Sequence, residues 1–128
     1  MIGLDTNVIV RYLVQDDPDQ AERARRTMDA LGPDRRGFVT RIVLVETFWV
    51  LTRSYRLARD EVLRTLLALV ERDEIAAEEH ARTVAALRAA CDGADLADAL
   101  IVETCRAAGV DDIVTFDRRA ASRGMTLI

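Results

Sequence analysis

Short β-like runs alternate with longer helical patterns along this sequence, and this alternation constrains the fold more than any other feature. The β-like runs are residues 1–4, 37–40, 74–77, 112–116 and 125–128. The helical patterns are residues 8–14, 16–31, 42–55, 59–72, 79–90 and 96–108. Strands that alternate with helices need crossover connections, which make neighbouring strands parallel and place helices on both faces of the sheet. The sequence therefore predicts an α/β fold with a mostly parallel sheet.

The length and the apolar content indicate one domain over residues 1–128. The chain has 128 residues, of which 50% are hydrophobic, and it contains no internal repeat, linker or low-complexity segment. A domain of this size holds a core without disulfides, and Cys91 and Cys105 have neither the number nor the spacing of a disulfide framework or a zinc site. No apolar run approaches the roughly 18 residues that a membrane span needs. We expect a cytoplasmic protein that does not enter a membrane.

Two acidic residues occupy positions in helices where apolar residues are expected. Glu46 is the only charge in the run from Ile42 to Leu51, and Asp98 has Ala94, Ile101 and Val102 as its helical neighbours. An ionised carboxylate on a buried face is costly unless it is paired or bound to a metal. We therefore expect both acids to belong to a site.

Two further acids directly follow β-like runs. Asp5 comes after Ile2-Gly3-Leu4, and Asp117 comes after Val114-Thr115-Phe116. The carboxyl ends of parallel strands line the ligand crevice of an α/β sheet, so all four acids can converge there. Carboxylate oxygens suit Mg²⁺ or Mn²⁺, and a cluster of them is best explained as a cation site. The alternative is that Asp5 and Asp117 only cap the helices that follow, and that Asp98 only favours a helix dipole.

Three neighbouring residues are candidates for supporting roles. Asp95 lies one helical turn before Asp98 and is expected to cap the helix or to orient the site without binding the metal directly. Thr6 and Thr115 flank the acids at the strand ends, where a hydroxyl can orient water or a carboxylate, or can simply complete a turn.

The absence of lysine removes several acidic-pocket enzymes from consideration. All 18 basic residues are arginine. Haloacid-dehalogenase-type phosphatases, response-regulator receiver domains and P-loop proteins all need a lysine at their site. The remaining reaction class is metal-assisted hydrolysis in which carboxylates hold the ion. The net charge of −4 argues against nucleic-acid binding by bulk attraction, although Arg11, Arg118 or Arg119 could hold flanking phosphates.

Four segments together resemble PIN-domain ribonucleases. They are Met1-Ile2-Gly3-Leu4-Asp5-Thr6-Asn7-Val8, Val45-Glu46-Thr47-Phe48-Trp49-Val50-Leu51, Asp95-Leu96-Ala97-Asp98-Ala99-Leu100-Ile101 and Val114-Thr115-Phe116-Asp117. The resemblance extends over essentially the whole chain, and it is strongest to the VapC-type toxins of bacterial toxin–antitoxin modules. Arg118-Arg119-Ala120-Ala121 lacks the further acid or aromatic residue that many relatives carry after the fourth acid.

The resemblance implies a three-layer α/β/α sandwich with four or five strands and an endoribonuclease that depends on Mg²⁺ or Mn²⁺. It assigns the metal and the catalysis to Asp5, Glu46, Asp98 and Asp117. We also expect a homodimer and an antitoxin protein whose basic tail enters the acidic pocket. The apolar stretches Phe48–Leu51 and Leu63–Val70 could hold both partners. Alternatives are a housekeeping RNA-processing enzyme, a DNA-directed nuclease and a binding module without catalysis.

Overall fold

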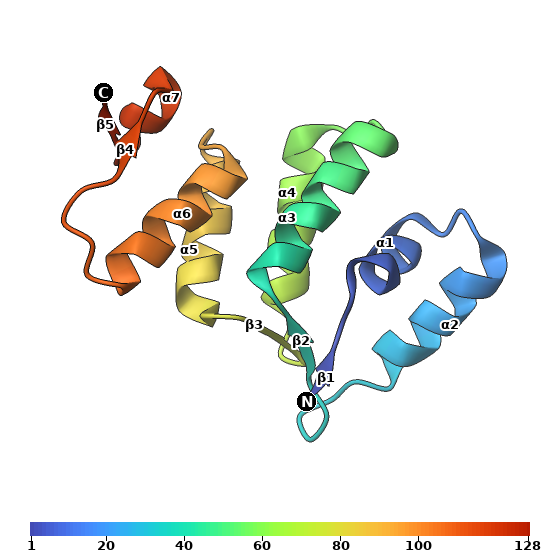
Figure 1. Cartoon of the computed structure of the whole chain (residues 1–128). Coiled ribbons are helices and arrows are strands. Elements are labelled where there is room, and N and C mark those ends of the chain that lie inside the picture. Colours follow the sequence, from blue (N-terminus) through green and yellow to red (C-terminus); the bar gives the residue numbers. More distant parts are fainter. The chain divides into compact units, whose positions relative to one another are not determined.

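The computed structural model describes all residues from Met1 to Ile128, which fall into two compact units. The first unit is Met1–Glu78 and the second unit is Glu79–Ile128. Figure 1 labels their helices and strands in chain order. Each unit has its own helices, its own parallel strands and its own apolar core.

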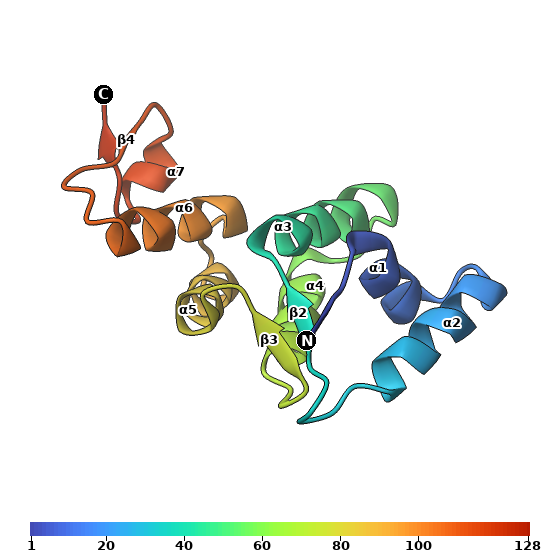
Figure 2. The same ribbon diagram turned by 60° about the horizontal axis from the view of Figure 1, so that its bottom comes forward.

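The first unit is a three-stranded parallel sheet with helical crossovers. Its elements are β1 (Ile2–Gly3), α1 (Thr6–Val14), α2 (Pro18–Asp29), β2 (Gly37–Val39), α3 (Arg41–Trp49), η1 (Val50–Ser54), α4 (Arg59–Val70) and β3 (Ile75–Ala77). The strand order is β1-β2-β3, with β2 in the centre (Figure 2). Phe38 of β2 pairs with Gly3 on one side and with Ala76 on the other. This order brings the carboxyl ends of β1 and β2 together at one edge of the sheet.

The two helices that lead into and out of β2 are bounded by side-chain caps. The carboxylate of Asp17 accepts a hydrogen bond of 3.0 Å from the Gln20 N–H at the start of α2, where Pro18 is the first helical residue. The hydroxyl of Thr40 accepts a hydrogen bond of 3.1 Å from the Val43 N–H at the start of α3. These caps satisfy amide groups that have no partner inside the helix, and they place α3 directly after β2.

Gly37 marks the tightest packing in the sheet of the first unit. A Cβ atom at this position would lie 2.8 Å from the Cδ1 atom of Leu4 and 2.9 Å from that of Leu31. The core around it includes fully buried Ile75 and Val39. Glycine is therefore needed here because β1, β2 and the chain after α2 approach one another closely.

The second unit pairs two helices with a small parallel sheet. Its elements are α5 (His80–Cys91), α6 (Leu96–Ala107), β4 (Val114–Thr115), α7 (Arg118–Ala121) and β5 (Thr126–Leu127). Helices α5 and α6 pack against each other over Leu87 and Leu96, which are both fully buried. Helix α6 is followed by Gly109, whose φ of 73° is the left-handed conformation expected of a glycine after a helix end.

The predicted α/β class with parallel strands is confirmed. The five predicted strands are present, three in the first unit and two in the second. The helix predicted over 42–55 divides into α3 and the π-helix η1, and α7 is the helix that the capping alternative places after Asp117. None of the helices combines the length and the apolar character that crossing a membrane requires. The single domain over residues 1–128 stays a prediction.

Candidate acidic site

Asp5 ends β1 and begins α1 without using its side chain as a cap. Its backbone is extended, with φ −81° and ψ 159°, and its carboxylate accepts no hydrogen bond from the first turn of the helix. The side chain is exposed. The capping alternative considered for Asp5 therefore has no support in the structure, and the carboxylate is available to a ligand.

Glu46 is joined to the neighbour of Asp5 by a hydrogen bond across 40 positions of sequence. The hydroxyl of Thr6, which is buried, donates to Oε2 of Glu46 over 2.9 Å. Thr6 lies at the start of α1, directly after β1, and Glu46 lies on α3, directly after β2. The structure thus brings Asp5 and Glu46 to the same edge of the three-stranded sheet, as expected for residues that follow parallel strands.

The surroundings of Glu46 differ from the sequence expectation. Glu46 is exposed, and its helical neighbours Ile42 and Trp49 are 71% and 42% exposed. The prediction that Glu46 lies on a buried stripe is wrong, because the buried face of α3 carries Leu44, Thr47 and Phe48 instead. Glu46 is held in place by Thr6 rather than by burial.

Asp98 lies among other acids in the second unit. Its pKa is raised above the ordinary value, first by burial, then by the charge of Asp95 and then by the charge of Asp117. Asp95 begins α6, and its carboxylate accepts a hydrogen bond of 2.9 Å from the Asp98 N–H. The structure therefore brings Asp98 and Asp117 within electrostatic range of each other and gives Asp95 the capping role expected for it.

Asp117 has a local structural role as well. Its Oδ1 atom accepts a hydrogen bond of 2.8 Å from the Arg119 N–H and thereby caps α7. The hydroxyl of Thr115 accepts a hydrogen bond of 3.0 Å from the Asp117 N–H. Capping accounts for one oxygen of Asp117 and leaves Oδ2 for another partner. Thr115 fixes the turn after β4, which is the simpler of the two roles considered for it.

None of the four carboxylates takes part in an ion pair, whereas Asp16, Glu74 and Glu78, among other acids of the chain, each pair with an arginine. Glu22 and Glu78, by contrast, each have a lowered pKa because they bond to arginine. Acids without a counter-charge fit a divalent cation, since hard oxygen ligands are what Mg²⁺ and Mn²⁺ require. The structure shows no group of three or more His, Cys, Asp or Glu side chains arranged to hold a metal ion.

One polar network near Asp5 escaped the sequence analysis. Arg11 donates hydrogen bonds to Gln20 on α2 and to the hydroxyl of Tyr55, which follows η1. Tyr55 in turn donates to Asp16 over 2.8 Å. The sequence indicates Arg11 only as one of several arginines that could hold phosphates. Its bond to Tyr55 joins residues 44 positions apart, and no local sequence pattern relates them.

Comparison with known families gives one match. The family described as PIN domain matches residues 2–124, which is nearly the whole chain, so the chain belongs to the PIN domain family. PIN domains are generally nucleases that hydrolyse phosphodiester bonds. Comparison with curated proteins and with solved structures gives no match.

Proposed function

We propose that this chain, as a member of the PIN domain family, is an endoribonuclease that depends on Mg²⁺ or Mn²⁺. The observation that carries the proposal is the set of four carboxylates without a counter-charge: Asp5, Glu46, Asp98 and Asp117. They stand in the four segments that resemble PIN-domain ribonucleases. Asp5 and Glu46 belong to the first unit, and Asp98 and Asp117 belong to the second.

The four acids are proposed to hold the ion, and the surrounding residues orient them. A bound divalent cation supplies Lewis-acid activation of the attacking water and neutralises charge on the phosphate. Thr6 fixes Oε2 of Glu46, and Asp95 fixes the start of the helix that carries Asp98. Burial first, and then the charges of Asp95 and Asp117, raise the pKa of Asp98 and disfavour its ionised form, and a bound cation would offset this cost. No histidine or serine nucleophile is needed for this reaction class.

We further propose that the physiological role is that of a toxin in a toxin–antitoxin module in the cytoplasm, acting as a homodimer. The support is the strong resemblance of the four segments to VapC-type toxins. The inhibitory partner would be an antitoxin whose tail places Arg or Lys among the acids, because a basic side chain can replace the missing cation. The test is growth after induction of the gene, with and without any short reading frame found beside it. An Arg→Ala change in the partner's tail that leaves inhibition intact contradicts this form of inhibition.

The nuclease proposal is tested by cleavage of a labelled, structured RNA in Mg²⁺, in Mn²⁺ and in EDTA. We expect products only with a divalent ion, and no products from the Asp5→Asn variant. The matched control is Asp34→Asn, because Asp34 is also an exposed aspartate of the first unit but lies outside the acidic site. Binding of Mn²⁺, measured by calorimetry, should weaken in Asp5→Asn and remain unchanged in Asp34→Asn.

The same experiment separates the alternatives. Cleavage that persists in EDTA contradicts the metal mechanism. Cleavage of a DNA strand of the same sequence, with RNA left intact, favours a DNA-directed nuclease. Binding of Mn²⁺ and RNA without any cleavage favours a binding module. A housekeeping role is favoured if no short reading frame lies beside the gene and if one RNA accumulates unprocessed after the gene is deleted.

A further inference from the structure

A polar groove lies between α1 and α2 in the first unit. Its volume is about 410 Å³. Its lining contains no acidic side chain, and its two apolar residues are Val8 and Ala24. The polar residues that line it are Asn7, Arg11, Gln20, Arg23 and Thr27. Two positive charges and three neutral hydrogen-bonding groups therefore face one space, which is a composition suited to an anionic ligand with further polar groups.

Arg11 is fixed in this groove by three hydrogen bonds. Its Nε donates to Gln20 over 2.7 Å, and its Nη1 donates to Asp16 over 3.1 Å and to the Tyr55 hydroxyl over 2.9 Å. These bonds use Nε and Nη1, so Nη2 takes no part in them. The side chain is only 28% exposed. A guanidinium held in this way has already lost its rotamer freedom, and its unused edge can bind an anion at little further entropic cost.

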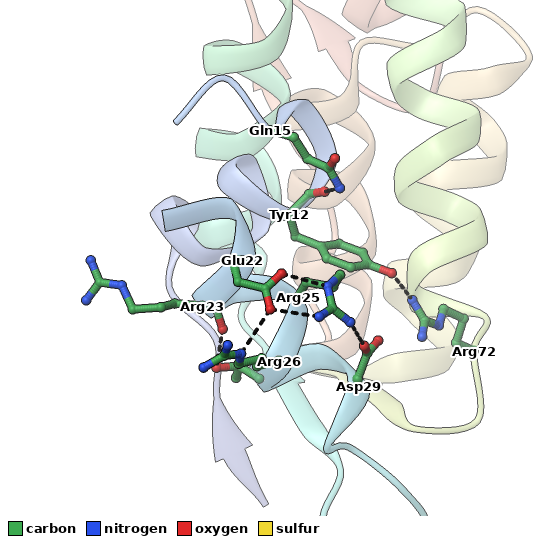
Figure 3. Close-up of polar contacts among 9 residues, drawn as sticks. Tyr12, Gln15, Glu22, Arg23, Arg25, Arg26, Asp29 and Arg72 are labelled. Atoms are coloured by element: carbon green, nitrogen blue, oxygen red, sulfur yellow. Dashed lines mark hydrogen bonds and ion pairs between the residues drawn. The ribbon is translucent and has the colours of Figure 1, made fainter. Parts of the chain in front are cut away.

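Arg23 supplies the second charge from the opposite wall. Its guanidinium pairs with Asp19 at 2.9 Å, but both side chains are well exposed, and such surface pairs are weak. Arg25 and Arg26 are engaged by Glu22, and Figure 3 shows that Arg23 extends away from these pairs. Arg23 is therefore free to exchange its partner for a ligand in the groove.

A second basic hollow continues along α2. Its volume is about 260 Å³, and Arg26 and Arg35 line it. Thr27 lines both hollows, so they adjoin along this helix. At the other end, the first groove includes Asn7, which lies two residues after Asp5. The first groove thus reaches the first turn of α1, the helix that follows Asp5.

We propose that the groove between α1 and α2 binds the phosphodiester backbone of the RNA strand that flanks the cleaved bond. Arg11 and Arg23 are the phosphate-binding residues, and Tyr55 is a positioning residue that holds Arg11. This inference rests on the proposed function, because it names how the nuclease binds its substrate. The chain has a net charge of −4, so RNA is not attracted by the protein as a whole, and a local basic groove overcomes that repulsion.

The test is binding of a fluorescent single-stranded RNA in EDTA, measured by anisotropy over a series of salt concentrations. For Arg23→Gln we expect about 5- to 10-fold weaker binding and a salt slope reduced by about 0.7, the value for one phosphate contact on a single strand. Arg11→Gln should behave in the same way. Tyr55→Phe keeps the charge but loosens Arg11, so it should weaken binding while leaving the slope nearly unchanged. The matched control is Arg64→Gln, because Arg64 is exposed on α4 and forms no ion pair.

The outcomes separate this inference from the proposed function. Unchanged binding and slope in Arg23→Gln overturn it, since the exposed Arg23 is replaced without damage to the fold. Weaker binding in Arg11→Gln alone, with the slope unchanged, also overturns it, because Arg11 then only braces α1. If RNA binds through the groove but is never cleaved in Mg²⁺ or Mn²⁺, the result contradicts the proposed nuclease activity and supports RNA binding in the groove. Failure of the unaltered protein to bind RNA overturns the groove even if cleavage is observed.

Discussion

The change Asp98→Asn tests whether this carboxylate belongs to a metal site or only begins a helix. Asp98 lies in the first turn of α6, where an acid normally gains about 0.3–1 kcal/mol from the helix dipole. Burial and the charges of Asp95 and Asp117 nevertheless raise its pKa. The unfavourable contributions to the ionised form therefore exceed the favourable one. Asparagine keeps the shape of the side chain and removes the charge that is repelled.

The magnitude follows from the exposure of the site. A like charge three positions away in a helix costs about 0.2–0.5 kcal/mol, and this applies to Asp95. Burial and Asp117 act in the same direction, but Asp98 is only partly buried, so solvent screens these effects. We expect Asp98→Asn to raise the free energy of unfolding by up to about 1 kcal/mol in EDTA at pH 8. For a chain of this length that is an increase of about 4 °C or less in Tm.

The pH dependence has a definite sign. Because the pKa of Asp98 is raised by folding, the folded protein binds the proton more tightly than the unfolded chain does. The stability that comes with the protonated form is complete below the ordinary aspartate pKa of about 3.9, and it is lost as the pH rises through the raised value. The advantage of the asparagine variant should therefore be largest at pH 8 and should vanish near pH 3.5.

The assay is a thermal melt of both proteins in EDTA at several pH values and again in excess Mg²⁺, together with RNA cleavage. In excess Mg²⁺ the difference in Tm between the two proteins should disappear or reverse, because only the unaltered site binds the ion tightly. The control is Asp60→Asn, which removes an exposed first-turn acid from α4 and should cost a few tenths of a kcal/mol under all conditions. If Asp98→Asn behaves like this control and still cleaves RNA, Asp98 lies outside the site and the four-acid proposal is wrong.

The remaining predictions concern the first unit and the metal. Thr6→Val removes the hydrogen bond that holds Glu46, and we expect slower cleavage and weaker Mn²⁺ binding, measured by kinetics and calorimetry, whereas Thr6→Ser should restore both. Gly37→Ala introduces a methyl group against Leu4 and Leu31, so urea titration should show a loss of about 1–3 kcal/mol in the free energy of unfolding. Saturating Mn²⁺ should raise Tm in the unaltered protein, by an amount that grows with the logarithm of its concentration, and a flat response contradicts the metal site.

The regular elements were predictable because their signals are local. The start of α2 is marked by Asp17 and Pro18, which the structure shows as a cap and a first helical residue. The end of α6 is marked by Gly109, whose conformation suits only glycine at little cost. In each case the physical cause lies within a few residues of the element, so a single sequence contains it.

The surroundings of the acids were harder to predict because they depend on tertiary packing. Glu46 lies within an unbroken apolar run, so the sequence does not indicate which side of α3 faces the core. In the structure the buried side carries Leu44 and Phe48. The bond from Thr6 to Glu46 spans 40 positions, and no periodicity encodes it. The positions of Asp5 after a strand and of Glu46 on a helix were nevertheless predictable from the sequence, because parallel crossovers fix that edge of the sheet.

The π-helix η1 makes the spacing between α3 and Tyr55 unusually sensitive to insertions and deletions. Its wider turns are marked by the bond from the Tyr55 N–H to the carbonyl of Val50, five positions earlier. Removal of one residue from η1 would convert the segment to ordinary α-helix and rotate every following side chain by about 100°. Tyr55 would then face away from Arg11 and Asp16, although every side chain of α3 kept its own surroundings. In relatives of this chain, a change of length at this point should therefore accompany a change of residue at the position of Tyr55.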